Sequence, residues 1–416
     1  MGSVASCLNQ GTEMTTRELY RAIGIGGYEP STCWRKEGMF FLQMKAPESC
    51  YRCPKCGNRD VKRRGTFDRV VHAPPIGMDR TTLFIKAPRL QCKRCNQVLN
   101  AVLPNVVPLC NYTKSFARLA IDLRKMMTIF DVAQYLGVSE TMIRSIDKKY
   151  LQKNFGKPRL RDLEIMAIDE IYVGRTQKFL TIVLNWQTGA IVFVGKGKGE
   201  NALNSFWKRL RSSRAKVKAV ATDMANAYYA AVRKNLPQAK HVFDRFHIIK
   251  RMNEKLTDLR RTLQNEAEQM DKKVLKGLRW LLLKHPDNLD DSKDERIRLQ
   301  EALALNQSLA TAYYLKDDLS QIWQQLDKTT AGKFLTDWCH RARASGIKVL
   351  MTMAKTLQAY RTGILNWYDF PISSGPLEGI NNKIGALQRM AYGYRDPEYF
   401  VDKLYALHIA KFALIG

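Results

Sequence analysis

Residues 163–170 read LEIMAIDE, a short apolar run that ends in two carboxylates, and this stretch decides the fold class. Apolar runs of this length, without a helical period, indicate a buried strand. Two similar runs follow at 179–184 and 190–194, and the segment Gln187-Thr188-Gly189 between them is a turn signal. The region is therefore expected to begin with three strands, the last two joined by a tight turn.

Helical and strand patterns alternate after these three strands. A mixed α/β sheet is the arrangement that such an order of elements predicts. No strand pattern appears from Ile248 to about Leu365, where the period is helical and is interrupted by Pro286 and the acidic segment 287–295. A second break at 371–376 precedes another helix. The alternating elements are expected at 201–211 (helix), 217–222 (strand), 224–234 (helix) and 241–243 (strand).

The composition indicates a polyanionic partner. The chain has 416 residues, 45% of them hydrophobic, so it can bury a large core and wholesale disorder is excluded. Its 68 Lys and Arg exceed its 39 Asp and Glu, which gives a formal net charge of +29. Nucleic acid is the commonest partner of so basic a protein. Neither a secretory signal nor a bilayer-spanning apolar run is visible, so we expect a cytoplasmic protein and exclude secreted and membrane proteins.

Nine cysteines, an odd and clustered set, fit metal binding better than a disulfide scaffold. Four of them form two C-x-x-C pairs on either side of the loop 57–91. Four thiolates at this spacing can close a tetrahedron around one structural Zn²⁺, with a β-ribbon occupying the loop. Cys50 also forms a C-x-x-C pair with the first of the four, and His72 is an alternative ligand. The predicted ligands are Cys53, Cys56, Cys92 and Cys95.

Residues 129–144 have the pattern of a helix-turn-helix motif. Ala133 allows a close helix crossing, Gly137 permits the turn and Ser139 is a suitable N-cap for the second helix. In so basic a chain we expect the motif to bind DNA, although an ordinary helical hairpin shares most of the pattern. The expected core is Val132, Leu136, Val138 and Ile143, and the side chains expected to face a major groove are Thr141, Arg144 and Lys148.

Three carboxylates are candidates for a metal site with oxygen ligands. Asp169 and Asp223 each follow an expected strand, where α/β folds gather their functional side chains. Glu378 opens the helix after the break at 371–376. Carboxylates that converge must be neutralised, and two Mg²⁺ (or Mn²⁺) ions per site would do this while activating a phosphodiester.

Simpler roles compete for each of these residues. Asp223 precedes an expected helix and is a suitable N-cap, and Glu378 in a first helical turn would complement the helix dipole. Asp244 follows a strand in the same way as Asp223 and competes with it as a metal ligand. His247 either contacts a phosphate or lies in a partly buried turn.

Seven segments occur together in this chain: CPKCG (53–57), CKRC (92–95), IDEI (168–171), TDM (222–224), DRFHIIK (244–250), LRWLLLK (278–284) and SSGPLEGINNKI (373–384). As a set they resemble the ISL-three family of bacterial insertion-sequence transposases, which are DDE enzymes, over about residues 50 to 410. The resemblance implies an RNase H-like catalytic domain with an all-helical insertion, and DNA cleavage and strand transfer at terminal inverted repeats. It also implies that Asp169, Asp223 and Glu378 are the catalytic, Mg²⁺-binding triad.

The expected protein is a multidomain α/β DNA transposase. We expect it to bind double-stranded transposon ends and target DNA at the bacterial nucleoid, as a homodimer or larger assembly, with Arg245, His247 and Lys383 as further DNA contacts. The alternatives are an RNase H-like nuclease without strand transfer and a zinc-ribbon DNA-binding regulator. The expected domains are 1–48 (a short helix at 16–23, role unknown), 49–105 (zinc ribbon), 110–155 (helix-turn-helix), 160–250 (catalytic core, first part), 251–370 (all-helical insertion) and 371–416 (catalytic core, second part, and C-terminal helix).

Overall fold

The structure is a computed structural model of the chain, and it divides into two compact units, which are described separately. Among the described residues, the first unit holds those up to Gly156 and those from Ala386 to Lys403, and the second unit holds the remainder. The expected helix at 16–23 lies outside the described residues except for Tyr20. The described residues are 24–174, 178–266, 278–373 and 375–407, together with Tyr20 and Leu275.

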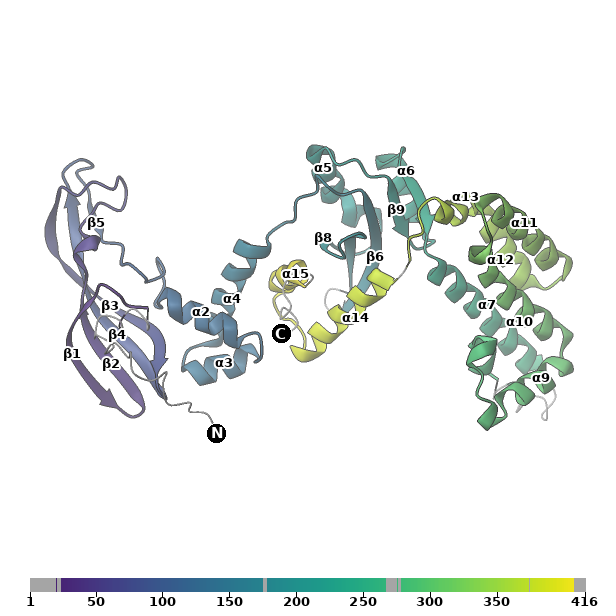
Figure 1. The fold of residues 1–416 in the computed structure, drawn as a ribbon, viewed down its shortest axis with the longest axis horizontal. Helices are drawn as coiled ribbons and strands as arrows, with labels where there is room; N and C mark the ends of the chain where they lie inside the picture. The colour runs from purple at the N-terminus through teal and green to yellow at the C-terminus, as the bar shows by residue number, and fades with distance from the viewer. Residues whose placement is uncertain are drawn as a thin grey trace, which may run out of the picture. The chain divides into compact units, whose positions relative to one another are not determined.

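A five-stranded sheet forms the N-terminal part of the first unit (Figure 1). Its strand order is β1-β2-β4-β3, and β5 pairs with β4. Strands β2 and β4 run parallel, while the other neighbouring strands run antiparallel. The long β3–β4 hairpin lies between the two cysteine pairs, as the sequence predicts. The strands are β1 (Glu29–Lys36), β2 (Met39–Lys45), β3 (Val61–Ile76), β4 (Asp79–Cys92) and β5 (Val98–Asn100).

Strands β1 and β2 have no counterpart in the sequence-based expectations. Every residue of β1 is exposed, so no alternation of apolar and polar residues marks the strand in the sequence. In β2, by contrast, Leu42 and Met44 are buried in the same core as Leu83 and Ile85 of β4. The segment before residue 49 therefore shares a sheet and a core with the ribbon.

Three helices follow in the first unit, and each begins at a hydroxyl N-cap. Thr113 caps α2, Thr128 forms a capping box with Asp131 at α3, and the Ser139 hydroxyl accepts a 3.2 Å hydrogen bond from the N–H of Met142 at α4. The expected cap at Ser139 is confirmed, since short polar side chains satisfy the free N–H groups of a first turn. The helices are α2 (Lys114–Leu123), α3 (Ile129–Leu136) and α4 (Glu140–Phe155).

The turn between α3 and α4 fits closely against the ribbon. Gly137 ends α3 with φ at 66°, and a Cβ built there would lie 2.5 Å from Nη1 of Arg80. Arg80, on β4, donates from Nη2 to the carbonyl of Gln134 (2.6 Å), which places a cation at the negative end of the helix dipole. A side chain at this position would have to displace Arg80, and the positive φ also favours glycine.

The expected core of the α3–α4 pair is largely confirmed. Val132, Leu136 and Ile143 are buried, and Val138 is half-buried.

A mixed five-stranded sheet lies at the centre of the second unit, with the order β10-β9-β6-β7-β8. Strands β6, β7 and β8 form an antiparallel meander, while β9 runs parallel to β6 and β10 parallel to β9. The predicted mixed α/β sheet is confirmed. The strands are β6 (Ile165–Gly174), β7 (Lys178–Asn185), β8 (Ile191–Lys196), β9 (Ala219–Thr222) and β10 (Lys240–Phe243), and the connecting helices are α5 (Asn204–Ser213) and α6 (Asn226–Asn235).

Helices and short turns make up the described chain between β10 and residue 370, as the sequence predicts. Helices α10 and α12 pack against α7, and α11 packs against α12 (Figure 1). Their shared core includes Trp338, which is fully buried and donates from Nε1 to the carbonyl of Leu315 at 2.8 Å. The helices are α7 (Arg245–Glu266), α9 (Glu295–Leu305), α10 (Gln307–Ser320), α11 (Lys328–Ala344), α12 (Lys348–Ala359) and α13 (Arg361–Leu365).

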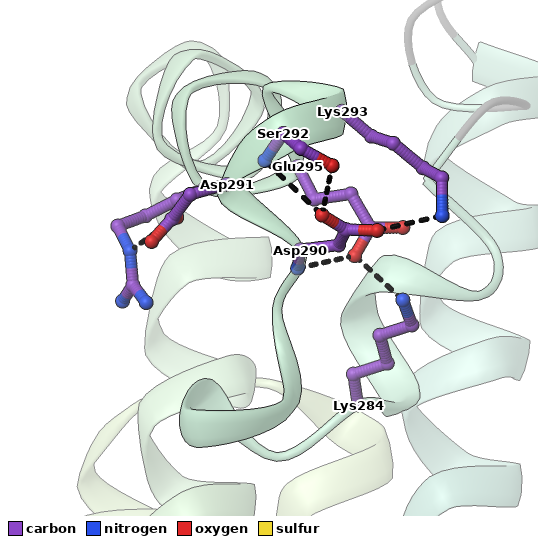
Figure 2. A network of polar contacts seen from close by, with 7 residues as sticks. Lys284, Asp290, Asp291, Ser292, Lys293 and Glu295 are labelled. Carbon is purple, nitrogen blue, oxygen red and sulfur yellow. Dashed lines mark hydrogen bonds and ion pairs between the residues drawn. The ribbon is translucent and has the colours of Figure 1, made fainter.

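Figure 2 shows how the acidic segment before α9 is held. The carboxylate of Glu295 accepts hydrogen bonds from Nζ of Lys284 (2.5 Å) and from the N–H of Asp290 (2.9 Å). Lys293, at 2.6 Å, and the Ser292 hydroxyl donate to the side chain of Asp290 and lower its pKa to about 2. These acids are paired with neighbouring groups, so the segment serves as a structured turn between helices.

Two helices end the described chain. Helix α14 (Gly375–Met390) begins at the break expected at 371–376, and α15 (Pro397–Ala406) follows it. Each contributes residues to both units. Within the residues that the structure describes, no helix combines the length and apolarity needed to cross a membrane.

Candidate active site and metal centre

The two cysteine pairs meet at one end of the β3–β4 hairpin. Their four Sγ atoms all lie within 4.8 Å of one another. The first pair lies in the loop before β3, where Gly57, with φ at 73°, donates its N–H to the carbonyl of Cys53 (2.9 Å) and closes a tight turn. The second pair ends β4, where the N–H of Cys95 points at Sγ of Cys92 (3.4 Å). A tetrahedral thiolate site for Zn²⁺ has this arrangement.

The electrostatics of the cluster also fit a cation. The pKa of the Cys53 thiol is lowered to about 7, mainly because the backbone N–H of Cys56 donates a hydrogen bond to it. A hydrogen bond with Cys56 and burial raise the pKa of Cys95 to about 12. Four thiolates so close together repel one another, and a bound Zn²⁺ removes this repulsion.

The two alternative zinc ligands have other positions. Cys50 belongs to the apolar core of the sheet, where burial raises the pKa of its thiol to about 11. His72 packs beside Phe116, with ring centroids 5.9 Å apart, and burial lowers its pKa. Neither residue is part of the four-sulfur cluster.

Asp169 and Asp223 lie at the same level of the central sheet. Strand β6 pairs with β9 in the register Ile165–Ala219 and Ala167–Ala221, and continuing this register by two residues aligns Asp169 with Asp223. The sequence predicted that Asp169 would end its strand, and this is wrong, because pairing with β7 extends β6 to Gly174. Asp169 lies two residues beyond Ala167–Ala221, the last pair of the parallel β6–β9 ladder, and so remains close to the end of that ladder.

Asp223 is not a helix N-cap, so that competing interpretation is wrong. Helix α6 begins three residues later, and its N-cap residue is Ala225. The Oδ1 atom of Asp223 instead accepts the N–H of Ala225 at 3.1 Å, in a local turn directly after β9. The Asp223 side chain is half-buried and lines an open pocket.

Asp244 occupies the same level one strand further along, because β10 pairs with β9 in the register Phe243–Thr222. It is only 3% exposed, and its Oδ1 accepts the N–H of Phe246 (3.0 Å), so it caps the start of α7. Its Oδ2 has no hydrogen-bond partner among the described residues and lies 3.9 Å from Nε2 of His247. Burial, with a smaller contribution from the charge of Asp169, raises the pKa of Asp244.

Glu378 lies in the first turn of α14 and is exposed. One helical turn later on the same helix, Nδ2 of Asn381 donates to Oδ2 of Asp169 at 2.7 Å. This hydrogen bond connects the helix of Glu378 with strand β6. Among the described residues, the three carboxylates do not form a group as tight as that of the four cysteines.

A pocket of about 350 Å³ opens beside Asp223. One of its walls is the first three turns of α7, which present mainly cationic side chains. A pocket with this charge is suited to the phosphates of a nucleic acid strand. The pocket is lined by Asp223, Met224, Ala225, His247, Lys250, Arg251, Glu254 and Lys255.

Comparisons with known proteins give the family. Residues 166–404 match the ISL3 family model, described as a transposase, and this match covers more than half of the chain. The chain belongs to the ISL3 family of transposases. Residues 51–95 match the zinc finger of the transposases IS204, IS1001, IS1096 and IS1165, so the transposase has the zinc ribbon that the sequence predicts.

Two relatives of the transposase are similar over most of their length. The transposase for insertion sequence element IS1001 of Bordetella parapertussis is 31% identical over 372 residues, which cover 88% of this chain and 90% of the relative. The transposase for insertion sequence element IS1557 of Mycobacterium tuberculosis is 25% identical over 377 residues, or 84% of each chain.

Three side chains of α4 were expected to contact DNA, and their surroundings differ. Thr141 is exposed, and Arg144 is half-buried with a loose ion pair to Glu140 at 3.7 Å. Lys148 lies 3.4 Å from carboxylates of both Asp396 and Glu398, so part of its charge is neutralised within the transposase. In the second unit, Arg245 and Lys383 are exposed and His247 lines the basic pocket.

Sequence reasoning did not assign a role to Asn381 or to the basic face of α7. The signal for Asn381 is an amide one helical turn after Glu378, but such spacing alone does not reveal that a strand residue lies opposite. The basic face follows from Lys250, Arg251 and Lys255, which repeat at three, four and eight residues after His247.

Proposed function

We propose that this transposase cleaves DNA at the ends of an insertion sequence and joins them to target DNA, with Asp169, Asp223 and Glu378 as catalytic residues. The observation that supports this best is the common level of Asp169 and Asp223 on adjacent parallel strands. The hydrogen bond from Asn381 to Asp169 supports it further, because it joins α14, the helix that carries Glu378, to strand β6. The meander β6-β7-β8, extended by β9 and β10, suits the RNase H-like domain that the resemblance implies.

The donor set of this site fits two Mg²⁺ or Mn²⁺ ions, because all of the proposed ligands are carboxylate oxygens. When bound, such ions activate the attacking water or 3′-hydroxyl and stabilise the leaving oxygen of the phosphodiester. The chain itself holds Asp169 through Asn381 and Asp223 through the turn after β9. Glu378 lies exposed in the first turn of α14, one helical turn before Asn381, and would be the third ligand.

The basic pocket beside Asp223 is the proposed path of the DNA strand. His247, Lys250 and Arg251 would contact phosphates next to the scissile bond, and Arg245 and Lys383 would contact the backbone further away. These contacts carry no base preference themselves. They would place the strand so that the reacting phosphate lies beside the carboxylates.

The first unit is proposed to recognise the element end. Helices α3 and α4 would act as a helix-turn-helix, with Thr141 and Arg144 facing the major groove. The four cysteines would hold one structural Zn²⁺, which ties the ribbon together. The proposed domains are the ribbon up to residue 105, now including β1 and β2, the helix-turn-helix over 110–155, the all-helical insertion over 251–370, and the catalytic core over 160–250 and from 371 onwards. Residues 386–403, at the end of α14 and in α15, belong to the first unit and not to the core of the second.

We also propose that the active form is a homodimer or larger assembly on double-stranded DNA. An element has two ends that must be cut and joined, and two copies of the site would serve them. The protein would act in the bacterial cytoplasm, at the nucleoid, where its positive charge of +29 favours contact with DNA.

Purified protein, Mg²⁺ and a plasmid that carries the element ends would test the function. Cleavage at the ends followed by joining to a second DNA supports the proposal. Cleavage without any joined product would favour the nuclease alternative. Binding to the ends without cleavage would favour the regulator alternative.

A further inference from the structure

Asn381 lies on α14, the helix that carries Glu378, and its side chain makes a hydrogen bond to Asp169 on strand β6. Its Nδ2 lies 2.7 Å from Oδ2 of Asp169, and both side chains are half-buried. The other oxygen of Asp169, Oδ1, accepts the N–H of Glu170 at 2.8 Å. Each oxygen of Asp169 therefore has an N–H donor, and the carboxylate is held in one orientation.

The Asp169 carboxylate determines which end of the Asn381 amide faces it. If the amide were turned over, Oδ1 would face the Asp169 carboxylate, and two acceptors would repel each other. In the observed orientation Oδ1 is buried, and no described residue donates a hydrogen bond to it. The amide thus leaves one buried acceptor unpaired while it keeps the bond to Asp169, and an unpaired buried acceptor is unfavourable unless the bond gained is strong.

A neutral donor suits this position better than a cationic one. Lys or Arg beside Asp169 would also orient the carboxylate, but the positive charge would compete with a divalent cation for the same oxygens. An amide N–H holds one lone pair of the carboxylate and leaves its negative charge available. Asn381 therefore orients Asp169 without weakening its attraction for a metal ion.

The position of Asn381 on α14 adds a second consequence. Glu378 lies three residues earlier, hence on the same side of the helix, since residues three and four apart are neighbours on a helix surface. A bond from Asn381 to β6 therefore sets the distance between the strand of Asp169 and the helix turn that carries Glu378.

We propose that Asn381 is a positioning residue of the catalytic site: it orients Asp169 for metal binding and holds the Glu378 turn of α14 beside strand β6. The inference rests on the proposed function, because it takes Asp169 and Glu378 to be metal ligands. It goes beyond that function by assigning a role to a residue outside the carboxylate triad.

The test compares N381A and N381L with N382A in the full-length protein, using Mg²⁺ alone as the probe. Asn382 is the matched control, because it is an exposed amide next to Asn381 on the same helix. The first measurement is the rise of the unfolding midpoint with added Mg²⁺, which reports metal binding without any reaction. The second is the Mg²⁺ concentration that gives half-maximal end cleavage.

We expect both Asn381 variants to need about tenfold more Mg²⁺ in both measurements, the change expected for loss of one hydrogen bond to a charged group. Excess Mg²⁺ should restore much of the cleavage, and N382A should match the unsubstituted protein. A lower unfolding midpoint in the absence of metal, with an unchanged Mg²⁺ requirement, would mean that Asn381 is merely structural and would overturn the inference. N381L keeps the branch at Cγ and fills the space of the amide without a polar group, so it remains informative if N381A folds poorly.

D169N separates this inference from the proposed function. If D169N still cleaves DNA, the proposed function itself is wrong. If D169N is inactive but N381A and N381L behave like the unsubstituted protein, only the role of Asn381 is wrong. In a D169N background the N381A substitution should cause no further loss of Mg²⁺ binding, because the interaction that it removes is already changed.

Discussion

Asp147 and Lys403 form a buried ion pair in the first unit, with Oδ2 and Nζ 2.9 Å apart and each residue only 3% exposed. Asp147 comes from α4 and Lys403 from α15, near the other end of the sequence. The same Oδ2 accepts the hydroxyl of Tyr399 at 2.5 Å and lies 3.5 Å from Nε of Arg124. The pair therefore joins the last described helix to the proposed helix-turn-helix.

Substitution of Asp147 should destabilise the first unit strongly. Asp147→Asn removes the carboxylate that pairs with both Lys403 and Arg124 inside the first unit, so we expect a loss of about 3–5 kcal/mol in unfolding free energy. Lys403→Met should cost less, because Asp147 keeps Arg124 and Tyr399 as partners. Urea unfolding of both variants measures the difference. Equal stability of Asp147→Asn and the unsubstituted protein would contradict the assignment.

The same carboxylate predicts a pH dependence. Burial alone would raise the pKa of Asp147, but Lys403 and Arg124 outweigh this effect and hold it below its ordinary value of 3.8. A carboxyl whose pKa is lower in the folded state contributes stability above about pH 4, and this stability is lost as the pH falls through the folded pKa. Unfolding measured between pH 6 and pH 2 should therefore show an acid loss that is smaller in Asp147→Asn.

The three proposed catalytic carboxylates should be indispensable for chemistry but not for DNA binding. Asp169→Asn, Asp223→Asn and Glu378→Gln preserve shape and remove the charge that binds Mg²⁺, so cleavage and strand transfer should both fall below detection. Binding to the element ends should be kept or become slightly tighter, because negative charge near the phosphates is lost. Gel-shift and cleavage assays on the same preparations measure both properties.

Asp244 is the control for that experiment, because it lies at the same level of the sheet but caps α7. Asn is an equally good N-cap, so Asp244→Asn should fold normally and keep measurable cleavage. A folded but inactive Asp244→Asn together with an active Asp223→Asn would move the second metal ligand from Asp223 to Asp244.

The cysteine cluster should bind one zinc per chain. Cys56→Ser removes one of four thiolates, so we expect the zinc content to fall and the β3–β4 hairpin to lose its fixed structure, while the second unit stays folded. Cys33→Ser is the matched control, because Cys33 is exposed and lies outside the cluster. Metal analysis of both proteins decides this, and a Cys56→Ser protein with unchanged zinc content would refute the site.

Arg144 should contribute to recognition of the element end more than Lys148 does. Loss of a side chain that reads a base costs about 1–3 kcal/mol of binding and relaxes the sequence preference, so this is the expectation for Arg144→Ala. Lys148 is already paired with Asp396 and Glu398, so Lys148→Ala should change the sequence preference little. Lys153→Ala, an exposed cation on the same helix, controls for loss of charge alone. Competition binding with terminal and unrelated DNA distinguishes the three.

Local patterns in the sequence were sufficient for most of the secondary structure. Strands β6, β7, β8, β9 and β10 follow from short apolar runs, because a buried strand must place apolar side chains on both faces of its sheet. The cap at Ser139 and the turn at Gly137 follow from local backbone needs that few residue types satisfy. Strand β1 could not be predicted, since an exposed edge strand carries no burial pattern.

The candidate site was predictable in its residue types but not in its contacts. The apolar run before Asp169 indicates a strand, yet the sequence does not show that β7 extends this strand beyond Asp169. The spacing of Asp223 and α6 suggests an N-cap, but the turn after β9 places the helix start at Asn226. Both differences arise because a neighbouring segment, and not the local sequence, decides where an element ends.

The sequence by itself determined the family motifs, the two paired cysteine motifs and the order of strands and helices in the second unit, because each depends on residue types at short spacing. Only the tertiary structure decided that Asp169, Asp223 and Asp244 share one level of the sheet, that Asn381 reaches Asp169 and that Asp147 pairs with Lys403. These contacts join segments far apart along the chain. Their partners are selected by strand register and helix packing, which are properties of the whole fold and leave no local pattern in the sequence.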